Sequence, residues 1–373
     1  MQAGWRVGTI FGIPFYINPS WIFVLFFLTL VYGQNWQQLY PEWGPILIWG
    51  GGLLVTLLLF TSLLLHELGH SMVARFQGIT VNSITLFLFG GVASIEKEAT
   101  TPGKAFQVAI AGPAVSLTLF GVLTGLSFLF PETNPFTILT RELAQINLIL
   151  AIFNLIPGLP LDGGQILKAA IWKVTGDRFQ GTRWAARAGQ FIGGLAIVLG
   201  LTALVLLRAS GGLWMALIGW FVIRNASLYD RLTTMQEVLL KVRAVDAMTR
   251  EFRVVDADLS IRRFADDYLL QESALPPAYF AASDGRYRGL VNSADISQVE
   301  RSQWETQTLW AILQPLDQVV SVAENTPIVE VINQIEAHEL KRITVLSPAG
   351  TVSGVIDRGD IVRVVTKSLN MPI

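Results

Sequence analysis

The amino-acid sequence predicts an α-helical membrane protein with several spans, joined to a soluble C-terminal half of α+β structure. Of its 373 residues, 52% are hydrophobic and only 15% are charged, a composition typical of multi-span membrane proteins with some soluble mass attached. The apolar character falls sharply after about residue 228. We therefore expect a membrane domain over 1–228, a linker over 229–241 and soluble structure over 242–373.

Hydrophobic stretches of spanning length predict about six transmembrane helices. They occupy roughly residues 15–32, 46–74, 104–130, 141–160, 187–207 and 211–228. Lys and Arg gather in alternate loops, which by the positive-inside tendency places both termini and the soluble half in the cytoplasm. Such a multi-pass protein, in contact with membrane lipid, is expected in a bacterial plasma membrane or an equivalent plastid membrane.

Residues 79–95 have a different pattern, in which β-branched and aromatic residues flank the pair Gly90-Gly91. This pattern predicts a membrane-associated β-hairpin or re-entrant strand pair. Irregular backbone is tolerated at membrane depth only where it is buried in protein or lines a cavity. A surface hairpin between two spans is the alternative. In the third span, the small residues Ala111, Gly112 and Ala114 predict close helix packing rather than chemistry.

The soluble half contains a weak internal repeat, with one copy near 254–295 and the other near 320–360. Each copy combines an apolar strand, a turn, an amphipathic helix, two strands and a second helix. Repeats of this size indicate duplicated modules that bury a shared face. We expect the two modules at 242–305 and 306–373.

Charge and residue counts exclude several classes of protein. The formal net charge of −1 gives no indication of nucleic acid binding. Because the chain has no Cys, it forms no disulfides and no cysteine-based metal site. Two of its three His residues fall in a single motif, and the third, His338, is expected on the surface of a helix.

The motif is His66-Glu67-Leu68-Gly69-His70, at the end of a stretch over 46–65 that carries no charge. Two His four residues apart share one face of a helix and can bind the same metal ion. Glu67 lies beside them, where it can take a proton from a metal-bound water. Ionisable groups at membrane depth are costly and usually functional. The apolar context therefore makes the motif a far stronger prediction of a catalytic zinc site than the residue pattern alone.

Two His do not complete a catalytic zinc site, which needs a third protein ligand. The best candidate is Asp162, which follows a segment broken by Pro157, Pro160 and Gly158. A carboxylate on unwound backbone at membrane depth needs a partner, and a zinc ion is a natural one. The alternative is that Asp162 caps the helix that follows it.

Two amides in the fourth span are further polar candidates. Asn147 and Asn154 can hydrogen-bond between helices, which is the more frequent role of such residues. Asn154 can instead hold the substrate backbone or a developing oxyanion.

These residues together resemble the site-2 protease family of intramembrane zinc metalloproteases. The resemblance rests on His66-Glu67-Leu68-Gly69-His70 and on Asn154-x-x-Pro157 followed by Leu161-Asp162-Gly163-Gly164, and it covers the whole membrane half. It implies one zinc ion per chain, held by His66, His70 and Asp162, with Glu67 as catalytic base. It also implies that Asn154 and the Gly90-Gly91 hairpin contact an extended substrate. The family cleaves single-span or membrane-anchored proteins, often anti-sigma factors or transcription-factor precursors.

The soluble half resembles a tandem pair of CBS modules, which commonly dimerise and bind adenine nucleotides. The signature Asp, which contacts ribose in that family, corresponds to Asp295 in one copy and Asp360 in the other. The signature Thr/Ser is replaced by Asn292 and Asp357. A carboxylate at 357 would lie close to a phosphate, which argues against nucleotide binding there. A homodimerisation or docking module is the alternative role.

Two other classes of function remain open from the sequence. One is a CBS-regulated transporter or channel in which the His/Asp cluster binds a cation. A transport site has no need of a base between paired His, so Glu67 favours the protease. The other is a membrane scaffold with an inactive site, which is less favoured because the predicted ligands and base are all present.

Overall fold

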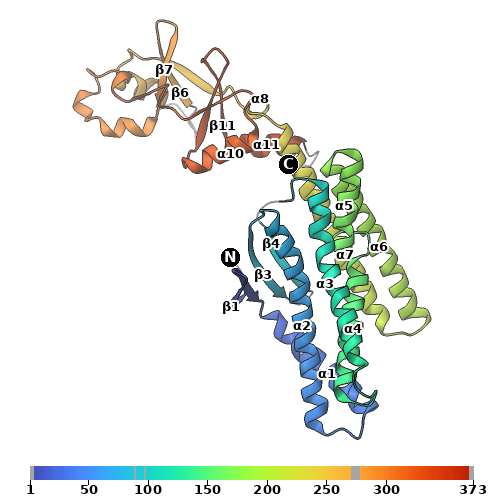
Figure 1. Ribbon diagram of the computed structural model, residues 1–373. Coiled ribbons are helices and arrows are strands. Elements are labelled where there is room, and N and C mark those ends of the chain that lie inside the picture. Colours follow the sequence, from blue (N-terminus) through green and yellow to red (C-terminus); the bar gives the residue numbers. More distant parts are fainter. Residues whose placement is uncertain (1–3, 88–89, 96–97, 270–277, 369–373) are drawn as a thin grey trace. The chain divides into compact units, whose positions relative to one another are not determined.

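The computed structural model describes residues 4–87, 90–95, 98–269 and 278–368 (Figure 1). Its internal contacts divide the chain into two compact units, Met1–Thr233 and Thr234–Ile373. Each unit has hydrophobic clusters of its own.

The first unit contains seven helices and a four-stranded sheet among the described residues. The helices are α1 (Ser20–Leu39), α2 (Pro45–Phe76), α3 (Pro102–Ser127), α4 (Pro135–Asn154), α5 (Asp162–Thr175), α6 (Arg178–Leu206) and α7 (Gly211–Lys241), which continues into the second unit. The strands are β1 (Trp5–Ile10), β2 (Ile13–Ile17), β3 (Val81–Phe87) and β4 (Gly90–Ile95).

The sheet has the order β1-β2-β3-β4, so β4 is an edge strand. β2 pairs in parallel with β3, and the other neighbours are antiparallel. Ile13, Ile84 and Leu86 are buried in one cluster with Phe60 and Leu68 of α2. The sheet therefore packs on α2, with β3 and β4 alongside it and α3 on the other side of the helix (Figure 1). The strands predicted within 79–95 are present, and their association with a membrane remains a prediction.

Helix α3 is central to the first unit, because it packs against α2, α4 and α5. Small residues permit the close approach: a Cβ added at Gly69 of α2 would lie 3.0 Å from the Ala111 carbonyl oxygen of α3. The packing predicted for this part of α3 is thus observed. Helices α6 and α7 also meet at glycines, and a Cβ at Gly193 would lie 2.7 Å from the Gly219 carbonyl oxygen.

Four helices of the described residues are long and apolar enough to cross a membrane, namely α2, α3, α4 and α6. The other two predicted spans fall in α1 and α7, which do not belong to this group, so the count of six remains a prediction. Many apolar side chains on these helices face outward, such as Ile149 of α4 and Phe191 of α6, which fits a lipid environment.

Several element boundaries differ from those predicted. The first predicted span, 15–32, begins within β2, and α1 starts only after Asn18, whose side chain accepts a hydrogen bond from the Ser20 N–H. The fourth, 141–160, is instead α4, which ends at Asn154 because Pro157 and Pro160 cannot continue a helix. Residues 229–241, predicted as a linker, belong to α7, since they contain neither Gly nor Pro.

The second unit contains two small α+β modules. The first has the strands β5 (Phe252–Asp256), β6 (Ala278–Ser283), β7 (Arg286–Val291) and β8 (Leu313–Pro315), in that order in one sheet. Its helical segments are α9 (Ile261–Phe264), a π turn at Ala265–Leu269 and 3-10 turns at Ser293–Gln298, Arg301–Gln303 and Leu309–Ala311. The other module has a sheet ordered β11 (Val352–Asp357), β10 (Arg342–Leu346) and β9 (Ser321–Ala323), with helices α8 (Ala244–Ala247), α10 (Ile328–Ala337) and α11 (Arg358–Ser368).

The two hydrophobic cores cross the predicted module boundary at 305/306. Ala244 and Ala247 of α8 are buried with Ile328 in the core of the second module. Leu309 and Ile312 are buried in the core of the first. The core of each module therefore includes a short apolar segment from outside the limits predicted for that module. The buried neighbours of each segment lie in the other half of the repeat.

Candidate metal centre

Helix α2 positions the three residues of the motif. His66 and His70 are 2% and 8% exposed, and their rings lie edge-to-face with centroids 5.0 Å apart. Their spacing of four residues places them one above the other on the helix. Glu67 is half-buried on the same turn. The helical arrangement expected for this motif is therefore present.

Asp162 reaches the two histidines from the start of α5. The segment between α4 and α5 is folded tightly, since Cβ atoms added at Gly163 and Gly164 would lie 2.3 Å from the Leu155 oxygen and the Gly158 carbonyl carbon. Asp162 is the first residue of α5, and no side chain caps that helix. The alternative of a capping Asp is thus not observed, and the carboxylate instead points to His66 and His70.

The three candidate ligand atoms form a small triangle. The His66 Nε2 lies 3.0 Å from the Asp162 Oδ2, the His70 Nε2 lies 3.3 Å from the same oxygen, and the two Nε2 atoms are 3.3 Å apart. A tetrahedral zinc ion with bonds of about 2.0–2.1 Å places its ligand atoms about 3.3 Å from one another. Nitrogen and carboxylate oxygen are also ordinary zinc ligands. The geometry and the chemistry of these donors therefore fit zinc.

Contacts from α3 complete the surroundings of the rings. The Nδ1 of His66 lies 2.9 Å from the Ser116 Oγ, and the Nδ1 of His70 donates to the Val108 carbonyl oxygen at 2.7 Å. A Cβ added at Gly112 would lie 2.2 Å from the His70 Nε2. The sequence predicted only helix packing for Gly112, and it gave no indication that Val108 and Ser116 contact the rings.

Glu67 is covered by strand β4. A Cβ added at Gly91 would lie 2.4 Å from the Glu67 Cγ and 3.0 Å from its carboxyl carbon. Glycine at 91 thus lets the strand backbone approach the carboxylate. The neighbouring Gly90 has a φ of +140°, and a Cβ there would meet nothing within 4 Å. Of the two predicted glycines, the structure brings Gly91 against the base and gives Gly90 no such contact.

The two asparagines differ in their surroundings. Asn147 is fully buried and donates to the Ser62 Oγ at 3.0 Å, which joins α4 to α2. This is the interhelical role expected of such a residue. Asn154 is the half-buried last residue of α4, and its side chain makes no hydrogen bond within the described part of the chain. Its role in binding a substrate remains a prediction.

In the second unit, Asp360 is engaged by its own module. It is 3% exposed, its carboxylate accepts from the Asp357 N–H at 3.0 Å, and the Asp357 carboxylate accepts from the Asp360 N–H at 2.9 Å. Arg363 forms an ion pair with it at 2.9 Å. Burial raises the pKa of Asp360. Asp295 instead accepts from the Gln298 amide at 3.0 Å, within the 3-10 turn at Ser293–Gln298.

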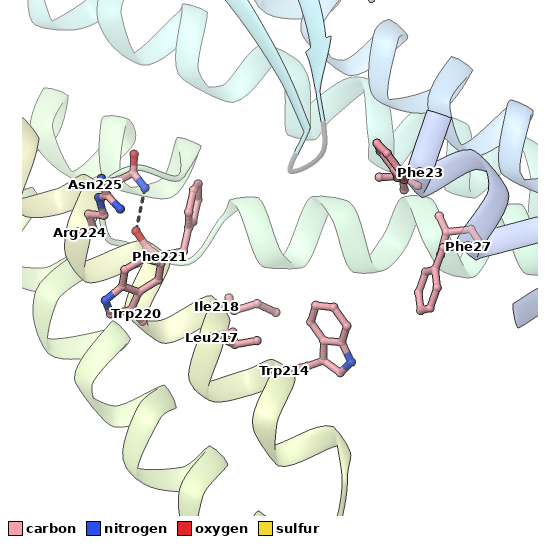
Figure 2. Close-up of a pocket in the computed structure, with 11 residues that line it drawn as sticks. Phe23, Phe27, Trp214, Leu217, Ile218, Trp220, Phe221, Arg224 and Asn225 are labelled. Carbon is pink, nitrogen blue, oxygen red and sulfur yellow. Dashed lines mark hydrogen bonds between the residues drawn. The ribbon is translucent and has the colours of Figure 1, made fainter. Parts of the chain in front are cut away.

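An apolar groove of about 770 Å³ lies between α1 and α7. Figure 2 shows Phe23 and Phe27 of α1 on one side and Trp214, Leu217 and Ile218 of α7 on the other. Arg224 and Asn225 lie toward one end, where the Asn225 amide donates to the Phe221 carbonyl at 2.8 Å. Both walls belong to the first unit.

A helix with the motif His-Glu-x-x-His, a carboxylate beside the two histidines and several long apolar helices are together typical of a membrane zinc metalloprotease. The family model "Peptidase family M50" matches residues 54–142 and 132–201, and the model "CBS domain" matches 312–367. A candidate zinc metalloprotease of Synechocystis sp. is 42% identical over 97% of this chain and 96% of its own length. The chain therefore belongs to peptidase family M50, the site-2 proteases, and carries a CBS domain.

Two further relatives and one solved structure are also similar to this chain. A zinc metalloprotease of Methanocaldococcus jannaschii is 29% identical over 97% of this chain and 96% of its own length. The solved structure of a site-2 protease from the same organism is 30% identical, covers 61% of this chain and 95% of its own, and has a TM-score of 0.43. A candidate zinc metalloprotease of Mycobacterium tuberculosis is 33% identical over 92% of this chain and 87% of its own length.

Proposed function

We propose that this protein is an intramembrane zinc endopeptidase of regulated intramembrane proteolysis, which hydrolyses peptide bonds of single-span or membrane-anchored proteins such as anti-sigma factors or transcription-factor precursors. One observation carries the proposal. The Nε2 atoms of His66 and His70 and the Oδ2 of Asp162 form a triangle with edges of 3.0–3.3 Å. This triangle lies beside the turn of α2 that also carries Glu67.

Each residue of the centre then has a role. His66, His70 and Asp162 would hold one zinc ion. Zinc bound there would supply a water of lowered pKa, about 7, and an electrophile for the scissile carbonyl. Glu67 is placed to take a proton from the attacking water and to pass it to the leaving amine. Its position against β4 keeps the carboxylate close to any peptide that pairs with that strand.

The substrate would bind as an extended strand on the free edge of β4. A helix hides its peptide bonds, whereas a strand added to a sheet edge exposes them and is held by main-chain hydrogen bonds. The backbone at Gly90 and Gly91 then borders the substrate, and the free amide of Asn154 can hold a substrate carbonyl. The apolar groove between α1 and α7 (Figure 2) supports access for the spanning segment of the substrate from the lipid.

The substitution Glu67→Gln tests the protease against the cation transporter. The glutamine keeps the size of the side chain but cannot accept the proton, so we expect zinc content equal to the wild type and no detectable cleavage of a tagged single-span reporter in proteoliposomes. The matched control is Glu132→Gln, because Glu132 is highly exposed and distant in sequence. Cleavage retained by Glu67→Gln would overturn the assignment of the base.

We further propose six spans with both termini and the CBS pair in the cytoplasm, in a bacterial plasma membrane or plastid membrane. The CBS pair would regulate cleavage or oligomerisation, by homodimerising or by binding an adenine nucleotide. Asp295 is the better ribose contact of the two candidates, because Asp360 already bonds to the Asp357 N–H and to Arg363.

A further inference from the structure

The groups that hold the two histidine rings lie on α3, a helix that carries none of the proposed ligands. We propose that α3 is the positioning element of the metal centre: Ser116 and the Val108 carbonyl orient the rings, and Gly112 leaves the space that the ion occupies. This inference rests on the proposed function, since it takes His66 and His70 as ligands.

The Val108 carbonyl determines which ring nitrogen of His70 is free to bind. A carbonyl oxygen only accepts, so at 2.7 Å the Nδ1 of His70 must carry the ring proton. The lone pair of the neutral ring then lies on Nε2. This is the atom that lies 3.3 Å from the Asp162 Oδ2.

Ser116 fixes the orientation of the His66 ring. Its side chain is fully buried, and its Oγ lies 2.9 Å from the His66 Nδ1. A hydroxyl can accept as well as donate, so it can receive the Nδ1–H hydrogen bond of the tautomer whose unprotonated Nε2 faces Asp162. Loss of such a partner behind a ligand typically weakens metal binding by about 10–100-fold.

Gly112 lies between these two contacts and faces the ligand atoms. A Cβ added there would lie 2.2 Å from the His70 Nε2 and 2.6 Å from the His66 Nε2. These distances approach the zinc–nitrogen bond length of about 2.0–2.1 Å. A methyl group at 112 would therefore take the place of the ion or push the rings aside. Because Val108, Gly112 and Ser116 are spaced by four, the carbonyl, the gap and the hydroxyl form one row along α3.

The first test replaces Ser116 by Ala in the full-length protein and measures zinc affinity by competition with a chelator. We expect affinity to fall by about 10–100-fold, and the visible absorption of the cobalt-substituted protein to change as one ring loses its fixed orientation. The control is Thr118→Ala, which removes an exposed hydroxyl of the same helix that bonds only to the Ala114 carbonyl. Affinity within twofold of wild type for Ser116→Ala would overturn its role.

The second test replaces Gly112 by Ala and measures zinc stoichiometry. We expect less than a tenth of the wild-type zinc, whereas Gly121→Ala, where a Cβ meets nothing within 4 Å, retains it fully. One zinc per chain in Gly112→Ala would overturn the proposal. Should that variant not fold, adding His66→Ala and His70→Ala should restore folding, since the clash is with the rings. A triple variant that still misfolds would contradict the role of Gly112.

The variant His66→Ala separates this inference from the function on which it rests. Wild-type zinc affinity in His66→Ala would contradict the assignment of the metal site, and with it the proposed function. Loss of zinc in His66→Ala, together with wild-type affinity in both Ser116→Ala and Gly112→Ala, would overturn only the role of α3.

Discussion

At the residue scale, some residues of the metal centre could be predicted from the sequence and others could not. His66, Glu67 and His70 are four residues apart at most, so local helix geometry alone places them together. Asp162 was predictable because two histidines leave a zinc site short of a ligand. Ser116 and Gly112 were not, because small residues in a span usually serve packing. Only the orientation of α3 in the folded structure shows which of its residues face the histidines.

Asp162 is the ligand whose role is easiest to isolate. We expect Asp162→Ala to lower zinc content markedly, since one of three protein donors disappears, and Asp162→Asn to retain more zinc because its amide oxygen can still coordinate weakly. Metal analysis of the purified protein measures both. The control Asp317→Asn changes an exposed carboxylate of the second unit and should leave zinc unchanged. Unaltered stoichiometry in Asp162→Ala would refute the assignment of the third ligand.

At the scale of elements, the site is made where α2 is enclosed by the sheet on one side and α3 on the other. The sequence predicts a strand pair in 79–95 from residue types, yet the pairing of β2 with β3 joins segments about seventy residues apart, which local patterns do not encode. Helix α5 was foreseen only in the alternative in which Asp162 caps the helix that follows it. The start of α1 was misplaced because hydropathy does not detect the Asn18 side chain that precedes the helix. The break after α4 was predicted from Pro157, although the span assigned by hydropathy ran beyond it.

The closeness of β4 to α2 gives a prediction about Gly91. In Gly91→Ala, the new methyl group would lie 2.4 Å from the Glu67 Cγ, so the base must move. A displacement of about 1 Å at a catalytic group can cost about 100-fold in rate. We expect a loss of that order in cleavage rate with normal zinc content. The control Gly8→Ala lies in the same sheet, where a Cβ meets nothing within 4 Å. Normal cleavage by Gly91→Ala would show that β4 does not constrain the base.

At the scale of the whole molecule, the fall in hydropathy after about residue 228 lies close to the division between the two units at Thr233/Thr234, because hydropathy averages over many residues. The predicted division into modules was less accurate. Ala244 and Leu309 belong to short apolar segments whose buried neighbours lie in the opposite half of the repeat. A sequence repeat indicates duplication, but it does not indicate which copy each connecting segment packs against.

The two units give a final prediction about regulation. If an adenine nucleotide regulates cleavage, it contacts Asp295 rather than Asp360, because the Asp360 carboxylate already bonds to the Asp357 N–H and to Arg363 and is buried beside a second carboxylate. We therefore expect AMP or ATP to change the cleavage rate of the full-length enzyme, and Asp295→Asn to abolish that change. The control Asp284→Asn changes an exposed turn of the same module. The backbone of Asp284 is left-handed, a conformation that asparagine tolerates. Identical wild-type rates with and without nucleotide would contradict this prediction and leave dimerisation as the role of the second unit. Light scattering of the purified protein measures dimerisation directly.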